Sequence, residues 1–145
     1  MALDFPKLHL ESVILRALGF RKHAIYSNQQ GYLQTSYVGS PKSPRTVAYE
    51  KPIGGSLGTG LRLERRLKPG CLGQEVASLK NPFHRILLIP ANFAEGLDFG
   101  IPAELFADSV RIGGIKRPMR MLDPTQAKKL KVAYEKATYR CMYAP

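Results

Sequence analysis

The strongest constraint on the fold is a series of short runs in which apolar and polar residues alternate. These runs occupy residues 23–27, 31–38, 45–51 and 61–67, and residues typical of turns separate each from the next. Because side chains alternate between the two faces of a strand, this period of two indicates β-strands joined by hairpins. In the last run Leu61 and Leu63 share one face while Arg62 and Glu64 share the other. If residues 45–51 pair with it, one face of the sheet could carry Tyr49 beside Glu64 and Arg62, in a register that the sequence does not fix.

Helical periodicity appears at both ends of the chain. Apolar residues recur at spacings of three and four over residues 8–18, before a glycine, which predicts an early amphipathic helix. Pro102 precedes a second helical pattern over 103–110, and Asp123 with Pro124 precedes a third over 125–137. We also expect a short helix over 74–80. The prediction is an α+β fold with an antiparallel sheet of about four strands, an early helix packed on it and a helical C-terminal part.

The charge of the chain favours an anionic partner. Its 145 residues, enough for one domain, carry 22 Lys and Arg against 11 Asp and Glu, a net charge of +11. Eight of the cations and only two acids lie between residues 111 and 136. No run of 18 apolar residues occurs, and the basic helices lack a wide apolar face, so we expect no membrane association. Nucleic acid is the expected partner.

Several familiar sites are excluded by spacing. Cys71 and Cys141 stand far apart, without the spacing of a zinc site, and are expected to be reduced thiols. The glycine-rich stretch over 54–60 lacks the lysine of a phosphate-binding loop and is expected to be a hairpin loop. The three histidines show no metal-ligand spacing. No small-molecule cofactor is predicted.

One constellation could carry chemistry: Tyr49 in a basic setting, with Glu64 and Asp4 as carboxylates. A tyrosine attacks phosphorus only where nearby cations favour the phenolate and withdraw charge from the phosphate. Mg²⁺ or Mn²⁺ bound to one or two carboxylates and to phosphate oxygens would assist. These residues therefore suit DNA strand nicking. Taken singly, Tyr49 also fits a packed strand aromatic, and Glu64 a solvated ion pair.

An ordered series of motifs over residues 31–68 resembles the gene II type replication initiation proteins of filamentous bacteriophages and related rolling-circle initiators. The series is Tyr37-Val-Gly-Ser-Pro-Lys-Ser, then Arg45-Thr-Val-Ala-Tyr-Glu-Lys, then Arg62-Leu-Glu. It is similar to that family's order of a tyrosine-glycine-serine strand, a tyrosine-lysine strand and an R-x-E strand. Residues 2–5 resemble the end of its acidic strand, and residues 99–137 its helical continuation.

The resemblance implies a metal-dependent enzyme that nicks and joins single- or double-stranded DNA at a phage origin, in the cytoplasm of a bacterial host. Tyr49 matches the nucleophile that remains linked to the 5′ end, and Tyr37 is the alternative nucleophile. Glu64 and Asp4 match metal ligands, for Mg²⁺ or Mn²⁺. The phosphate contacts would come from six basic residues: Lys42, Arg45, Lys51, Arg62, Arg66 and Lys68. Residues 1–88 form the sheet-containing nuclease-like region, and 89–145 the basic helical region of the same domain.

The chain departs from the family pattern at its start. It opens inside the acidic motif, without the arginine and the first aspartate, so a separate chain is a candidate to complete the domain. The alternative function is a non-catalytic DNA-binding or regulatory fragment of such an initiator. A basic RNA-binding protein fits the charge as well, but leaves the ordered motifs unexplained.

Overall fold

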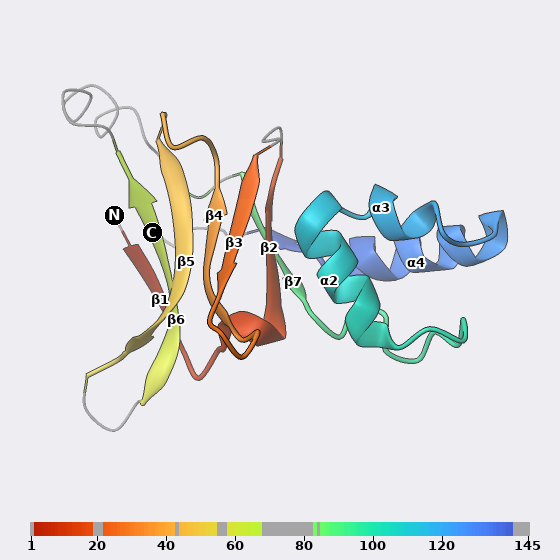
Figure 1. The fold of residues 1–145 in the computed structure, drawn as a ribbon, viewed down its shortest axis with the longest axis horizontal. Coiled ribbons are helices and arrows are strands. Elements are labelled where there is room, and N and C mark those ends of the chain that lie inside the picture. The colour runs from red at the N-terminus through yellow and green to blue at the C-terminus, as the bar shows by residue number, and fades with distance from the viewer. Residues whose placement is uncertain are drawn as a thin grey trace.

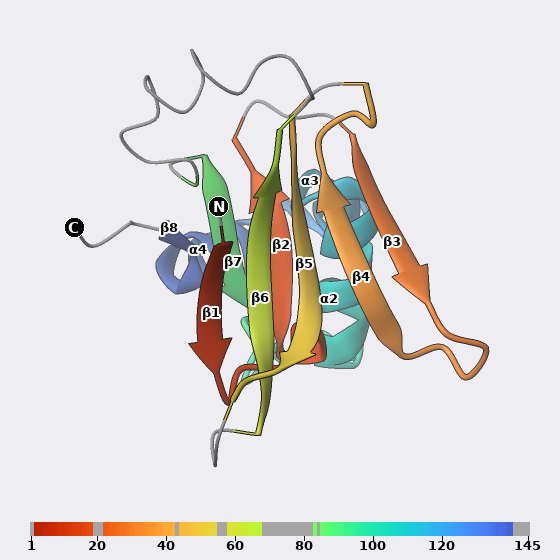
Figure 2. The same ribbon diagram turned by 90° about the vertical axis from the view of Figure 1, so that its left-hand side faces the viewer.

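Two antiparallel sheets and a C-terminal group of helices make up the part of the chain that the structure, a computed structural model, describes: residues 2–18, 22–42, 44–54, 58–67, 83 and 85–140. The larger sheet contains β1 (Ala2–Pro6), β6 (Thr59–Arg66), β5 (Arg45–Pro52), β4 (Leu33–Val38) and β3 (His23–Ser27), in that spatial order. The smaller sheet contains β2 (Val13–Ala17), β7 (Ile86–Pro90) and the two-residue β8 (Tyr139–Arg140). Figure 2 looks onto the larger sheet.

The four predicted strands are β3, β4, β5 and β6, which are consecutive neighbours in the larger sheet. Hairpins join β3 to β4 and β5 to β6, and β5 also pairs antiparallel with β4. Gly31 closes the first hairpin with φ of 87°, a conformation that glycine adopts without steric cost. Gly60 permits β1 to approach β6, since a Cβ there would lie 2.6 Å from the carbonyl oxygen of Phe5. The local alternation therefore specified these hairpins, and β1 adds a fifth strand.

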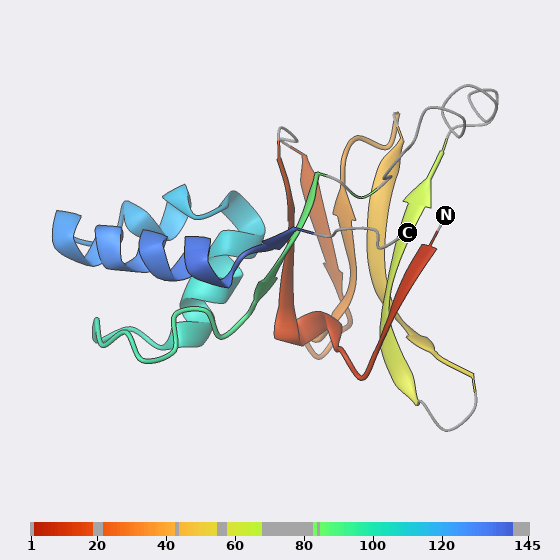
Figure 3. The ribbon, with the colours of Figure 1, turned by 180° about the vertical axis from the view of Figure 1, so that it is seen from behind.

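The elements form three layers, seen edge-on in Figures 1 and 3. The inner face of the larger sheet packs its apolar side chains, Leu61 and Leu63 among them, against one face of β2 and β7. The opposite face of β2 and β7 packs against the helices, with Ile14 and Ile89 buried there. The smaller sheet is thus the middle layer, and the outer face of the larger sheet points away from the helices.

The early helix predicted over residues 8–18 is wrong. Those residues form a short 3₁₀ turn, η1 (Leu10–Ser12), followed by strand β2. In β2, Val13 and Leu15 join the core facing the larger sheet, while Ile14 joins the core facing the helices. A strand buried on both faces carries a continuous apolar run, and such a run mimics the apolar spacing of a helix.

The predicted C-terminal helices are confirmed as α2 (Ala103–Gly113) and α4 (Pro124–Ala137), with the short α3 (Lys116–Met119) between them. The Asp123 carboxylate caps α4 by accepting from the amide of Gln126, whose side chain accepts in return from the Asp123 amide. The α+β class is confirmed. The predicted helix over 74–80, Lys68, Cys71 and Cys141 lie outside the described residues. None of the described helices has the length and apolar character needed to cross a membrane.

Candidate functional site

The outer face of the larger sheet gathers eight of the predicted residues, the alternative nucleophile Tyr37 included, from four strands. Antiparallel register places Tyr49 opposite Arg62, Arg62 opposite Asp4, and Arg45 opposite Arg66. Because alternate residues share a face, one surface carries the whole set, which we call the outer-face site: Asp4, Tyr37, Arg45, Tyr49, Lys51, Arg62, Glu64 and Arg66. This confirms the predicted pairing of the strands that carry Tyr49 and Glu64.

A chain of hydrogen bonds runs across β5 and β6 at the centre of this site. The hydroxyl of Tyr49 donates to Glu64 Oε2 at 2.8 Å, and Arg66 Nε donates to Glu64 Oε1 at 3.0 Å. Arg66 thereby fixes the carboxylate in the orientation that receives the phenol proton. Tyr49 and Arg66 also line a hollow of about 520 Å³ over β4 and β5. The arrangement is a phenol, a carboxylate that accepts its hydrogen bond and a guanidinium that orients the carboxylate, the pattern that an activated nucleophile would require.

A second ion pair lies next to this chain, on β1 and β6. The guanidinium of Arg62 donates from Nε and Nη2 to the two oxygens of Asp4, each at 2.6 Å. This two-pronged geometry is the one in which arginine binds carboxylates and phosphates most specifically. Lys51 acts on the same carboxylate through its charge.

The pKa values of the three acidic groups shift in directions set by these bonds. The hydrogen bond to Glu64 raises the pKa of Tyr49, because ionisation would place a phenolate beside a carboxylate. The same bond, with help from Arg66, lowers the pKa of Glu64, and the bonds from Arg62 lower the pKa of Asp4. Arg62 acts in the opposite direction and lowers the pKa of Tyr49, as expected of a nearby cation, but the hydrogen bond to Glu64 outweighs it. Tyr49 is held as a phenol beside an ionised acceptor.

The described residues do not form a prepared metal site. Asp4 and Glu64 lie diagonally on adjacent strands, and each has an arginine bonded to its carboxylate. Among the described residues, no group of three or more His, Cys, Asp or Glu side chains stands ready to hold a metal. A divalent ion would have to displace Arg62 or Arg66 from these two carboxylates, so the donor set fits Mg²⁺ or Mn²⁺ poorly as it stands.

Tyr37 has different neighbours from Tyr49. The guanidinium of Arg45 lies 4.5 Å from the centre of the Tyr37 ring, and Tyr26 packs edge-on against that ring at 5.5 Å between centroids. Tyr26 is 59% exposed and was not among the predicted site residues. Its position in the alternating run over 23–27 is the sequence feature that indicates a side chain on one face of the sheet. Lys42 lies in the loop between β4 and β5, exposed and outside the sheet face.

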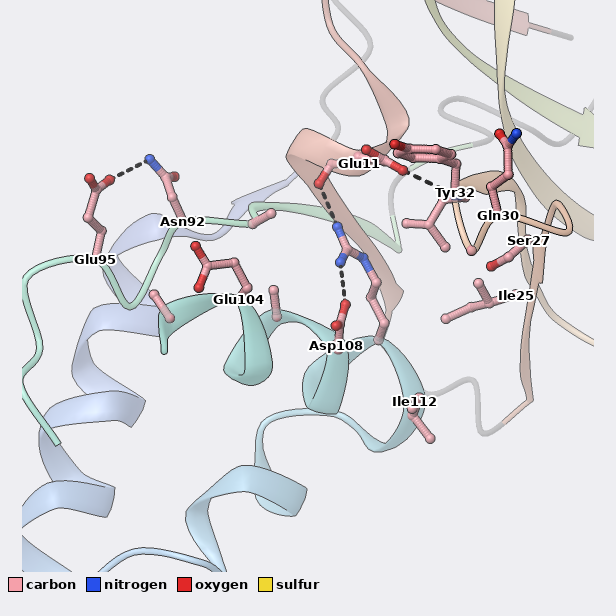
Figure 4. Close-up of a pocket in the computed structure, with 16 residues that line it drawn as sticks. Glu11, Ile25, Ser27, Gln30, Tyr32, Asn92, Glu95, Glu104, Asp108 and Ile112 are labelled. Carbon is pink, nitrogen blue, oxygen red and sulfur yellow. Dashed lines mark hydrogen bonds and ion pairs between the residues drawn. The ribbon is translucent and has the colours of Figure 1, made fainter. Parts of the chain in front are cut away.

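A larger cleft of about 950 Å³ separates α2 from η1 and the β3–β4 turn (Figure 4). Four of the 11 acids in the chain line it: Glu11, Glu95, Glu104 and Asp108. Arg111 joins its walls by donating to Asp108 and to the carbonyl oxygens of Glu11 and Val13. Sequence reasoning missed this cleft because its acids come from separate elements. Their charge makes it unsuitable for a polyanion.

No protein-family model matches this chain, and no curated protein matches it significantly.

Proposed function

We propose that this chain nicks and joins DNA through Tyr49, as an initiator of rolling-circle phage replication in the cytoplasm of a bacterial host. The observation that carries the proposal is the hydrogen-bonded series Tyr49–Glu64–Arg66 on a sheet face that also presents Arg45, Lys51 and Arg62. Packed aromatics in a sheet need no ionised acceptor. A tyrosine that attacks phosphorus does, because the phenol must lose its proton as the bond forms.

In the proposed step Glu64 accepts the proton from the Tyr49 hydroxyl while the phenolic oxygen attacks the DNA phosphorus. The bond from phosphorus to the 3′ oxygen breaks and the 5′ phosphate remains on Tyr49. The leaving 3′ oxygen takes a proton from bulk water and becomes a free hydroxyl, and Glu64 afterwards releases its proton to the solvent. Joining reverses these transfers. Arg62 lies across from Tyr49 and neutralises charge that develops on the phosphate oxygens.

The expected cofactor, Mg²⁺ or Mn²⁺, remains a separate proposal. The paired state of Asp4 and Glu64 gives it no direct support, and no part of the step above passes through an ion. Performing the nicking reaction with either ion and with EDTA tests the requirement independently of the nucleophile.

The first experiment combines the purified protein with supercoiled phage DNA and analyses the products on denaturing gels for a covalent protein–DNA adduct. We expect wild type to nick and to form the adduct, Tyr49→Phe to lose both, and Glu64→Gln to nick at least about 100-fold more slowly, the usual minimum loss for a positioned acid or base. Tyr37→Phe is the matched control and should keep the activity. Adduct loss in Tyr37→Phe with retention in Tyr49→Phe would contradict the assignment.

One observation favours the non-catalytic alternative, a DNA-binding regulatory fragment. Both carboxylates of the outer-face site are bonded to arginines. A surface that only binds DNA does not need these carboxylates free to hold a metal, so it is compatible with this pairing. DNA binding by wild type without a nick or adduct, with or without divalent ions, would support this alternative. Restored nicking on addition of a second chain would instead support the expected partner that completes the domain.

A further inference from the structure

We infer that Arg62 and Lys51 form a phosphate-binding position beside Tyr49, and that the Asp4 carboxylate occupies this position until DNA displaces it. The inference deepens the proposed function and rests on it, because the ligand it names is a phosphate group of the DNA backbone. It assigns Asp4 the role of a competitor for the phosphate position, which is different from that of a metal ligand.

The geometry of the Asp4 contact is that of an anion in a binding site. Both oxygens of the carboxylate receive hydrogen bonds from the fork of the Arg62 guanidinium, and Lys51 adds charge from β5. A phosphodiester presents two non-bridging oxygens with the same charge and similar spacing, which arginine binds in the same way. The Asp4 carboxylate and a DNA phosphate therefore compete for one cation.

The position of this cation links it to the chemistry. Arg62 is the cross-strand partner of both Asp4 on β1 and Tyr49 on β5. The same guanidinium lowers the pKa of the Tyr49 hydroxyl. A phosphate that replaces Asp4 on Arg62 would lie next to the hydroxyl that attacks it.

Asp4 can leave without disrupting the sheet. Its side chain is 36% exposed on β1, which lies at one end of the strand order of the larger sheet. The backbone register of β1 with β6 holds the strand in place whichever way the side chain turns. Release therefore requires loss of the two hydrogen bonds from Arg62 and rotation of the Asp4 side chain into solvent, with no change in the backbone.

The test measures binding of a fluorescent oligothymidylate to wild type, Asp4→Asn and Asp98→Asn by anisotropy over a range of salt concentrations. Asp98→Asn removes the same charge from an exposed position between β7 and α2 and is the matched control. We expect Asp4→Asn to bind about tenfold more tightly at low salt, since a charged hydrogen-bonding group is freed for phosphate. Its slope of log affinity against log salt should steepen by about 0.7, one phosphate on a single strand.

Further variants define the outcomes. Adding Arg62→Gln to Asp4→Asn should abolish the gain, and thermal unfolding of each variant checks that the fold survives. Equal affinity changes in Asp4→Asn and Asp98→Asn, or weaker binding by Asp4→Asn, would overturn the inference while leaving DNA binding intact.

A second readout separates this inference from the proposed function. Inorganic phosphate titrated into ¹⁵N-labelled Asp4→Asn should shift the Arg62 Nε resonance at lower concentration than in wild type. Absence of oligonucleotide binding by every variant would overturn the DNA proposal, and equal phosphate responses in the two proteins would overturn the phosphate position.

Discussion

At the scale of single residues, the hydrogen bond between Tyr49 and Glu64 determines what the outer-face site can do. The ionised acceptor raises the pKa of the Tyr49 phenol further above neutrality, so reactivity depends on transfer of that proton during attack. Deprotonation by alkali alone would remove the hydrogen bond. The bond is therefore present below the raised pKa of Tyr49 and is lost as pH rises through it.

We expect Glu64→Gln to lower the pKa of Tyr49 toward the usual tyrosine value of about 10, because the amide removes the negative charge beside the phenolate. An NMR pH titration of protein labelled with ¹³C in its tyrosine rings would measure this, with the Tyr49 signal identified by its absence in Tyr49→Phe. Tyr26, exposed on β3, serves as the internal control. An unchanged Tyr49 midpoint would show that Glu64 does not govern its proton.

At the scale of elements, strand β2 connects the two cores of the molecule. Val13 and Leu15 are buried against the larger sheet, and Ile14 between them is fully buried against the helices. A strand in this middle position stabilises both interfaces. Truncation of one of its buried side chains should therefore destabilise the fold more than truncation of an exposed side chain on a helix.

Ile14→Ala should lower the free energy of unfolding by about 3 kcal/mol, the usual loss for a large aliphatic side chain truncated in a core. Ile112→Ala is the matched control, because Ile112 is 63% exposed on α2, and it should change stability by less than about 0.5 kcal/mol. Denaturant unfolding followed by circular dichroism gives both values. Similar losses in the two variants would contradict the packing of β2 in the middle layer.

At the scale of the whole molecule, charge is distributed unevenly over surfaces that point in different directions. The outer-face site has four cations and two acids, whereas the cleft beside α2 has four acids and Arg111. A basic helix, α4, lies on the opposite side of the molecule from the outer face (Figure 3). The outer-face site and α4 are therefore two alternative surfaces for DNA binding. The proposed function requires that DNA bind the outer face of the larger sheet.

Salt dependence distinguishes the two surfaces. We expect the double variant Arg45→Gln/Lys51→Gln to reduce the slope of log affinity against log salt by about 1.4 for single-stranded DNA, two phosphate contacts. The control variant Lys128→Gln/Lys129→Gln, with both changes on the exposed face of α4, should leave the slope close to that of wild type. The reverse pattern would place the DNA on the helices, and a flat dependence in wild type would contradict electrostatic DNA binding altogether.

The sequence by itself determined the hairpins, the C-terminal helices and the shared face of Arg62 and Glu64. These features follow from local alternation, turn residues and caps, which act over a few residues. The sequence made Tyr49 and Glu64 neighbours only on condition that their strands pair, and the register of β5 with β6 brings them into contact.

Only the tertiary structure decided the rest. Residues 13–17 form a strand because apolar cores cover both faces of β2, and neither core is visible in the local sequence. Asp4 and Arg62 are 58 residues apart in the chain, so their ion pair depends on contact between β1 and β6. Under the inference above, this ion pair determines whether Arg62 is available to a phosphate. The acidic cleft likewise combines residues from η1, the segment after β7 and α2, whose proximity arises only when the layers pack.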